Sequence, residues 1–297
     1  MTNPTTSIQY DPATYWQAPA RHFRSSARLH LQHYLGQNTL GYLLDPRIEA
    51  SLDASKSFSV ADLGCGNAAW LVDLERDLAK KGRSARLDGF DINSVNFLAL
   101  AFLPESVTLK KLDILSGVPE ELKGTYDVVH IRAFVSIIEN SNVTPLLSTV
   151  LALLRPGGWI QWEESLADKF RVDAPSPDVS KTMCETIAQM LKTAGEARGS
   201  PFGFVEQLDQ KLKEHDFEGV SMNAHKKRKQ DLKAWTDDYL MVWEELWVHF
   251  PPKATAHQAP MNRETWIDMF LGAVNETENG VVIHHGQVMS ATGRKPL

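Results

Sequence analysis

The stretch VADLGCGNAAW, residues 60–70, joins a short apolar run to the beginning of a helical pattern. Gly64 and Gly66 fall between the strand predicted over 58–64 and the helix predicted over 68–81. A side chain at such a turn would keep the backbone away from a ligand, and the helix N-terminus offers free N–H groups. The stretch therefore predicts a ligand-binding turn at the edge where parallel sheets bind their ligands.

Strand and helix patterns alternate through the middle of the chain. Apolar runs predict strands over 58–64, 86–92, 107–115, 126–132 and 159–165, and helical spacing predicts helices over 68–81, 94–102 and 143–154. The run Pro156-Gly157-Gly158 is a strong helix stop before the last of these strands. This alternation is typical of an α/β fold with a parallel sheet.

The flanking segments are mostly helical in pattern. One or two short helices are predicted over 27–44, with breaks near Gly36 and Gly41. Further helices are predicted around 179–190, 204–217, 235–250 and 266–274, and strands that return to the sheet edge over 280–285 and 287–295. We expect one domain over 1–297, with an N-terminal arm and helices over 1–57, a core over 58–165, lid helices and a sheet extension over 166–279, and a final strand region over 280–297.

Composition excludes several classes of protein. The 297 residues carry a formal net charge of −6, which argues against a nucleic-acid binder, because such proteins usually have a basic face. Two cysteines make no disulfide framework, no secretory signal is visible, and the longest uncharged apolar stretch, 144–154, is too short to span a bilayer. We therefore expect a cytoplasmic protein, with nuclear entry as the alternative, that acts on a small molecule and on neither nucleic acid nor a membrane. The oligomeric state is left unpredicted.

The glycine turn fits two ligand templates. As GxGxxA it fits a dinucleotide-binding turn, and Asp91 follows Ala69 by 91 − 69 = 22 residues, close to the spacing of about 20 at which an acid holds the ribose. As an acidic-x-Gly-x-Gly turn it fits the nucleoside site of S-adenosylmethionine (SAM)-dependent methyltransferases.

Three acids favour the SAM template. Asp62 ends the first strand beside the turn, where its negative charge would repel a pyrophosphate and would suit an amino group and a sulfonium cation. Asp113 ends the strand over 107–115, where a carboxylate can accept a hydrogen bond from an adenine amino group. With Asp91, three acids follow three successive strands, so we expect a site for a cationic nucleoside. The alternative is that these are solvated residues at strand ends.

Residues 58–165 resemble the class I SAM-dependent methyltransferases, with the motifs in their usual order. The segments ARLHLQHYL (27–35), YDVVHIRAF (126–134), LLRPGGWIQWEE (153–164) and GRKP (293–296) extend the resemblance to fungal methyltransferases of secondary-metabolite clusters. The resemblance implies a Rossmann-like, mostly parallel sheet with an antiparallel last strand, an N-terminal helical arm, a helical lid and SAM as cofactor. One departure is Ala68, where many relatives have a third glycine.

The resemblance also implies roles for individual residues. It places Gly64 and Gly66 against the amino-acid part of SAM, Asp91 on the ribose hydroxyls and Asp113 near the adenine. The predicted cofactor set is completed by further residues at the same strand ends: Asp62, Cys65, Ile92, Ile114 and Arg132.

The sequence assigns no catalytic base and no metal site. A base helps when the acceptor is a hydroxyl or an ammonium, and His130 and His33 are the weak candidates, with a buried structural histidine as the alternative for His130. Cys65 is interpreted as a small turn residue, and His284 and His285 lack companion ligands.

Substrate contacts are predicted from aromatic and acidic residues above the expected cofactor. The candidates are Phe134, Glu163, Trp243 and Trp247. For Glu163 and its neighbour Glu164, at the end of the strand over 159–165, the alternative is exposure to solvent. Trp235, Trp243 and Trp247 share one helical face, so packing under the lid is the favoured interpretation of that helix. The run KKRK over 226–229 is interpreted as a solvated strand end, with a nuclear-import patch or a phosphate contact as alternatives.

The leading hypothesis is SAM-dependent methyl transfer to a hydroxyl, amine or thiol of a small, largely apolar metabolite. The alternatives keep the fold: non-consumptive use of bound SAM to promote a cyclisation or rearrangement, or a methyltransferase-like regulator of secondary metabolism. A nicotinamide-dependent oxidoreductase is the least favoured hypothesis.

Overall fold

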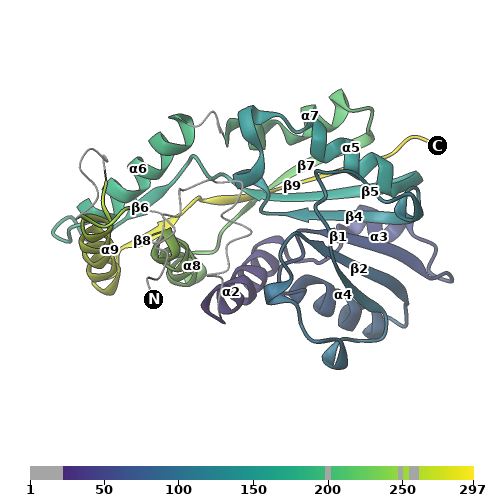
Figure 1. The fold of residues 1–297 in the computed structure, drawn as a ribbon, viewed down its shortest axis with the longest axis horizontal. Coiled ribbons are helices and arrows are strands. Elements are labelled where there is room, and N and C mark those ends of the chain that lie inside the picture. Colours follow the sequence, from purple (N-terminus) through teal and green to yellow (C-terminus); the bar gives the residue numbers. More distant parts are fainter. Residues whose placement is uncertain (1–22, 198–201, 247–249, 254–260) are drawn as a thin grey trace, which may run out of the picture.

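The computed structural model describes residues 23–197, 202–246, 250–253 and 261–297, so residues 1–22 of the arm and helices predicted over 1–57 lie outside the described residues. The described helices are α2 (Phe23–Leu40), α3 (Pro46–Ser51), α4 (Ala69–Lys80), α5 (Thr144–Leu153), α6 (Thr182–Ala197), α7 (Leu208–Glu214), α8 (Leu232–Glu245) and α9 (Arg263–Glu278) (Figure 1). The described strands are β1 (Phe58–Leu63), β2 (Ala85–Asp91), β3 (Val107–Lys111), β4 (Tyr126–Arg132), β5 (Leu154–Ser165), β6 (Arg171–Asp173), β7 (Glu218–Lys226), β8 (Val282–His284) and β9 (Gln287–Arg294).

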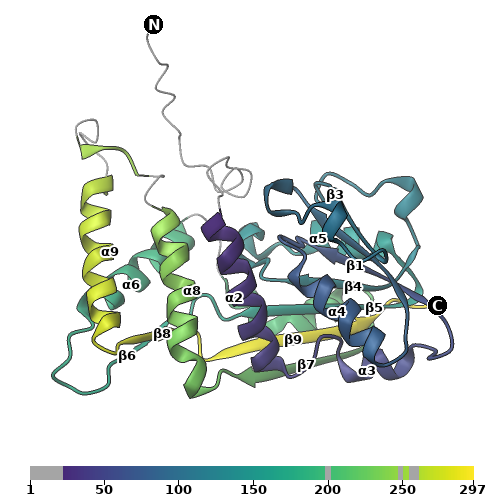
Figure 2. The same ribbon diagram turned by 90° about the horizontal axis from the view of Figure 1, so that it is seen from below.

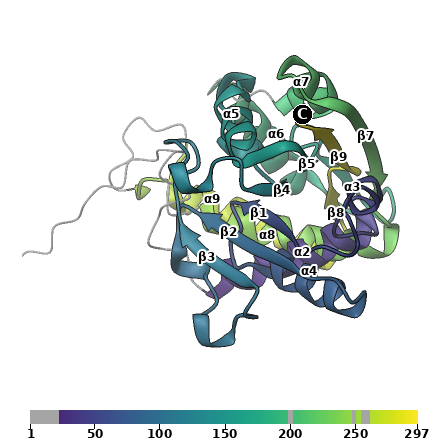
Figure 3. The same ribbon diagram turned by 90° about the vertical axis from the view of Figure 1, so that its right-hand side faces the viewer.

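Seven strands form one sheet in the order β3-β2-β1-β4-β5-β9-β7. Strands β1 to β5 pair in parallel, and β9 pairs antiparallel with both β5 and β7. Figure 3 shows the strands fanned from β3 to β7. The predicted Rossmann-like sheet, mostly parallel with an antiparallel last strand, is confirmed.

Helices cover both faces of the sheet. α4 and α2 lie on one face, and α5 and α7 lie on the other (Figures 1 and 2). The predicted apolar stripe of α4 is confirmed, because Leu71, Leu74 and Leu78 are all buried against the sheet. Full burial also explains why apolar residues dominate β1 and β4, as expected for parallel strands covered on both faces.

A second group of elements lies beyond the carboxyl ends of the parallel strands. It contains α6, α8, α9 and a two-stranded sheet of β6 and β8 (Figure 1). Its apolar core includes Trp235, Trp243 and Trp266, all buried, which confirms the packing interpretation for the first two. No described helix has the length and apolarity needed to cross a membrane, and both cysteines are free and buried.

Three predicted elements on the amino side of the chain differ from the structure. α2 runs through Gly36 without a break and ends before Gly41, whose φ of +83° is the left-handed geometry that favours glycine after a helix. The segment 94–102 forms two 3-10 turns, Ser94–Asn96 and Leu100–Phe102, instead of one helix, because Phe97 and Ala99 are extended. β3 ends at Lys111, so Asp113 lies in the loop beyond it.

The carboxyl side of the chain differs in the placement of its last strands. β9 was predicted at the sheet edge, but it lies inside the sheet, because β7 adds outside it, and β8 pairs with β6 in the separate sheet. The helix predicted over 204–217 is a 3-10 segment, Phe202–Gln207, followed by the short α7. β7 had no apolar alternation to reveal it, since much of it is exposed at the edge.

Gly89 of β2 lies where the sheet passes beneath the glycine turn, and it leaves no room for a side chain. A Cβ there would lie 2.7 Å from Leu109 Cδ2, 2.8 Å from Cys65 Sγ and 2.8 Å from Leu71 Cδ1. We expect Gly89→Ala to lower the free energy of unfolding by about 1–3 kcal/mol through overpacking, measured by urea denaturation. Gly203→Ala is the control, because a Cβ at Gly203 meets nothing within 4 Å; equal stabilities of the two variants would contradict the prediction.

Candidate active site

The glycine turn lies at the carboxyl end of β1. Gly64 and Gly66 have φ values of +65° and +57°, which are left-handed, and a Cβ at Gly64 would lie 2.4 Å from Phe134 Cε2. Ala68, at the N-cap of α4, also has a left-handed φ of 63°. The turn thus keeps the backbone geometry that a third glycine would give, at a cost of about 1 kcal/mol in backbone strain.

The Cys65 side chain between the two glycines is buried. Burial raises the pKa of its thiol well above the ordinary value, and the nearby Asp62 and Asp91 charges raise it further. The thiol therefore stays protonated, which supports its interpretation as a turn residue and excludes a thiolate nucleophile.

The Asp91 carboxylate ties the end of β2 to the glycine turn. Its Oδ2 accepts a hydrogen bond from Gly66 N at 2.9 Å, and its Oδ1 accepts one from Asn93 N at 2.9 Å. Its backbone oxygen accepts from Leu112 N at 2.9 Å, which brings the loop that carries the exposed Asp113 next to it. The structure thus places the acids at the ends of β2 and β3 side by side at the carboxyl edge, with Ile92 half-buried and Ile114 buried beside them.

Asp62 begins a chain of buried charged groups that crosses three strands. His130 of β4 faces two carboxylates: its Nδ1 lies 2.7 Å from Asp62 Oδ1 and its Nε2 lies 3.4 Å from Glu163 Oε2. Arg132 Nε donates to the same Glu163 oxygen at 2.6 Å. The remaining Glu163 oxygen accepts from Gln161 Nε2 at 2.6 Å.

The pKa shifts in this chain follow from its charges. Burial opposes ionisation of Glu163, but the Arg132 guanidinium and the hydrogen bond from His130 outweigh it and lower the pKa of Glu163 to about 2. Burial alone would lower the pKa of His130, but the Asp62 and Glu163 charges raise it overall. His130 is therefore best described as an imidazolium held between two carboxylates.

The chain of charged groups continues from Arg132 to α2. Arg132 Nη1 lies 3.3 Å from His33 Nδ1, and His33 Nε2 lies 2.9 Å from Asp73 Oδ2 of α4. Burial and the Arg132 charge lower the pKa of His33 to about 4, so this imidazole is neutral at pH 7. Trp70 stacks on His130, with ring centroids 3.7 Å apart and planes inclined by 4°.

These contacts decide the two base candidates. Both ring nitrogens of His130 and both of His33 have partners within the chain of charges, and each ring is buried. Neither has a nitrogen free to accept the proton of a bound molecule. Glu163, predicted as a substrate contact, has no exposed surface and serves instead as the counter-charge of Arg132.

Glu164 is a functional candidate that sequence reasoning left beside the alternative of solvent exposure. It is buried, and its Oε1 accepts from Trp162 Nε1 at 2.8 Å and from Phe134 N at 2.6 Å. Burial raises the pKa of Glu164 from 4.5 to about 7. Its carboxyl fixes the loop after β4, and so fixes the Phe134 ring that lies on Gly64. The sequence did hold a sign of this contact. A Glu two residues after a Trp in a strand points to the same face of the sheet, so the two side chains can meet.

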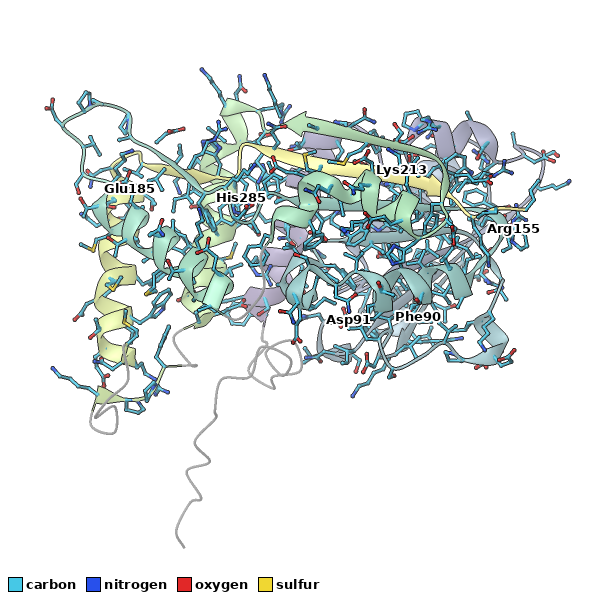
Figure 4. The ribbon with its side chains drawn as sticks, turned by 90° about the horizontal axis from the view of Figure 1, so that it is seen from above. Phe90, Asp91, Arg155, Glu185, Lys213 and His285 are labelled. Carbon is cyan, nitrogen blue, oxygen red and sulfur yellow. The ribbon has the colours of Figure 1, made fainter. Side chains whose placement is uncertain are left out.

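The remaining predicted residues lie away from the glycine turn. Trp243 is buried in the helical group, where its backbone oxygen accepts from Trp266 Nε1 at 3.2 Å, and Trp247 lies outside the described residues. The interpretation of KKRK as a solvated strand end is wrong for Lys227, which is buried while Lys226 is exposed. Figure 4 shows Asp91 at the end of the sheet core and His285 where the helical group joins it.

Comparison with known proteins reveals relatives of one kind. No protein-family model matches the chain. The chain is 34% identical over 188 residues to methyltransferase grgD of a Penicillium species, a match that covers 62% of this chain and 64% of the relative. It is 31% identical over 147 residues to N-methyltransferase tcpN of Claviceps purpurea (strain 20.1), covering 49% of this chain and 50% of the relative. The matches thus span less than two thirds of the length of these relatives.

A solved structure matches nearly the whole chain. The plantazolicin methyltransferase BpumL, in complex with a triazolic desmethylPZN analog and SAH, superposes with a TM-score of 0.52 at 13% identity, covering 96% of this chain and 95% of that chain. The chain has the class I methyltransferase fold. In this class I fold the described glycine turn, Asp91 and the loop with Asp113 lie at one edge of the sheet, as ligand sites of open α/β sheets do.

The buried Glu164 carboxyl makes stability depend on pH. Its pKa is higher in the folded state, about 7, than its ordinary value of 4.5, so the folded state binds this proton more tightly and the stability it contributes is lost as pH rises through about 7. Glu164→Gln removes this dependence of stability on pH, and its amide oxygen can still accept the hydrogen bonds from Trp162 and Phe134. We expect the free energy of unfolding of the variant, relative to the wild type, to rise by about 2–3 kcal/mol between pH 5 and pH 8.

Urea denaturation at several pH values measures this difference. Glu196→Gln is the matched control, because Glu196 is exposed on α6, and its stability difference from the wild type should be independent of pH. Parallel curves for Glu164→Gln and the wild type would contradict the assignment of a raised pKa.

Proposed function

We propose that this chain binds SAM at the carboxyl edge of β1, β2 and β3 and transfers its methyl group to a small acceptor molecule. The single observation that supports this most is the left-handed Gly64–Gly66 turn pinned by Asp91, with Gly66 N and the Asp91 carboxylate 2.9 Å apart. A carboxylate at the end of the second strand can accept from two ribose hydroxyls.

The charges of the turn fit a cationic nucleoside. Asp62, which is paired with His130, and Asp91 flank the turn, and residues 62–70 contain no arginine or lysine, so the turn itself offers a pyrophosphate no cationic side chain. The amino group and sulfonium of SAM would complement these carboxylates. A Cβ at Gly64 would enter the space against Phe134, which explains why the backbone alone faces this part of the site. When bound, SAM would supply the electrophilic methyl group.

The acceptor proposed is a small, largely apolar metabolite that is methylated at nitrogen, oxygen or sulfur. The match to a relative named an N-methyltransferase favours nitrogen. The helical group beyond the carboxyl edge, with its aromatic core, supports a role as the lid over the acceptor. Placement of the chain in the cytoplasm or the nucleus stays a prediction.

One observation keeps a second function in view: both histidine candidates are engaged within the buried chain of charges. A protein without a proton acceptor at its site could use bound SAM without consuming it, to promote a cyclisation or rearrangement. The two functions differ in whether S-adenosylhomocysteine is released.

Cofactor binding tests the placement of SAM. We expect Asp91→Asn and Asp91→Ala to weaken SAM binding about 10- to 100-fold, because a hydrogen bond to a charged group contributes about 1.5–3 kcal/mol. Isothermal titration calorimetry measures the affinity. Asp268→Ala, an exposed aspartate of α9, should bind SAM as the wild type does; undiminished affinity of both Asp91 variants would mean that SAM does not bind here.

Turnover tests the transfer itself. Wild-type protein with SAM and each of three probes that share the naphthalene ring system, 2-naphthol, 2-naphthylmethylamine and 2-naphthalenethiol, should form S-adenosylhomocysteine and methylated product in equal amounts, measured by mass spectrometry. Chemical change of a probe without S-adenosylhomocysteine would support the non-consumptive function. SAM binding with no change in any probe would support the regulator hypothesis and contradict transfer.

A further inference from the structure

Lys227 is a buried lysine without an ion pair among the described residues. Its Nζ lies 2.6 Å from Tyr239 Oη and 3.4 Å from the centroid of the Trp235 ring. Burial lowers the pKa of Lys227 to about 7, although the Asp238 charge opposes the shift. Near neutral pH a large fraction of this side chain is therefore an uncharged amine with a free lone pair.

A hydrogen-bonded row leads away from Lys227. Tyr239 Oη lies 3.0 Å from His285 Nδ1. His285 Nε2 is buried and has no hydrogen-bond partner among the described residues. Burial lowers the pKa of His285 well below its ordinary value, and the charge of Lys227 adds to the shift, so the imidazole is neutral. The row thus ends in one nitrogen with unused capacity to accept a proton.

The row lies at the carboxyl edge of the sheet. Lys227 N donates to Gly286 O at 3.0 Å, directly after β7 pairs with β9. The Ser165 side chain, at the end of β5, hydrogen-bonds Tyr239. The same edge carries the glycine turn, and β5 is the neighbour of β4 in the sheet.

Other charged groups around the row lie on α2, on α8 and beside β8, and among the described residues Asp238 is the one whose charge acts on Lys227 itself. Asp238 of α8 is buried, with Arg28 and Gln32 of α2 close to it, and burial raises its pKa to about 6. Glu245 lies 3.6 Å from Arg28, and His284 Nε2 lies 2.9 Å from Asp173 Oδ2. These groups set the charge around Lys227 without occupying its nitrogen.

We propose that Lys227, Tyr239 and His285 form the proton relay that accepts the acceptor's proton during methyl transfer; this rests on the function proposed above. The acceptor X–H loses its proton to His285 Nε2 as the X–CH3 bond forms and the S–CH3 bond of SAM breaks. His285 Nδ1 passes its proton to Tyr239, whose hydroxyl proton moves to Lys227 Nζ. The positive charge of the sulfonium is thereby replaced by a lysine ammonium, and S-adenosylhomocysteine leaves neutral.

Packing alone does not account for this cluster. An apolar side chain of similar length, such as methionine, would fill the space against Trp235 and Tyr239 without the desolvation of an amine. A buried lysine with a shifted pKa beside a histidine with an unsatisfied nitrogen is the arrangement found at sites that move protons. The phenyl ring of Phe170, with its centroid 4.2 Å from that of His285, keeps the imidazole in place.

The test compares probes that need a base with one that does not. 2-Naphthol must lose a proton during transfer, whereas 2-naphthalenethiol is already ionised at about pH 8 and needs no base. We expect Lys227→Met to lower the rate of S-adenosylhomocysteine formation with 2-naphthol by about 10²- to 10⁴-fold and with the thiol by less than about threefold. Tyr239→Phe, which keeps the ring and breaks the row, should show the same selective loss.

Lys226→Met is the control, because Lys226 is the exposed neighbour in the same run; its rates should equal those of the wild type. SAM affinity, measured by calorimetry, should be unchanged in all three variants. An equal loss with both probes, or no loss, would overturn the relay while leaving the proposed function intact. An inactive wild type would overturn both.

A second measurement needs no acceptor. In protein labelled with carbon-13 at the lysine ε position, the NMR signal absent from Lys227→Met should titrate near pH 7 in the wild type. A titration at the ordinary pKa of lysine, about 10.4, would overturn the relay whatever the probes show.

Discussion

The chain of buried charged groups organises the carboxyl edge of the sheet. In it, His130 lies between Asp62 and Glu163, and Arg132 balances the charge of Glu163. Each of these four residues comes from β1, β4 or β5, so the chain of charged groups crosses the strands at the level where their loops begin. Burial makes each charge costly alone, and removal of one partner leaves the others uncompensated. These charged groups therefore specify how the three strands are aligned, more than they add to the net stability of the fold.

The glycine turn is held at both of its ends by contacts with these charged groups. Asp62 precedes Gly64 by two residues, and Trp70, in the first turn of α4, stacks on His130. Both ends of the turn are thus attached to the same imidazolium. At the far end Arg132 contacts His33, which attaches α2 to the core. His130 and His33, the weak base candidates, thus have a structural role, and the proposed proton relay lies in another part of the fold.

The parallel core could be predicted from the sequence because its strands are buried on both faces and are therefore rich in apolar residues, as in β1 and β4. It failed where structure depends on contacts between distant residues. β7 is an edge strand with exposed polar residues, and nothing local shows that β9 pairs between it and β5. Lys227 is the clearest case: a run of four basic residues predicts solvent, but Trp235 and Tyr239 of α8 close over its second lysine.

The proposed relay joins two regions that lie apart in the sheet. The glycine turn follows β1, whereas Lys227 follows β7, and β4, β5 and β9 separate those strands. In the sheet, β9, which follows His285, lies one strand nearer to the glycine turn than β7, which precedes Lys227. His285 comes from the segment that leads into β9, and Tyr239 spans the gap between its ring and Lys227. In the proposed relay, a proton taken up nearer the middle of the sheet is stored at the edge on Lys227, whose burial lowers its pKa to about 7.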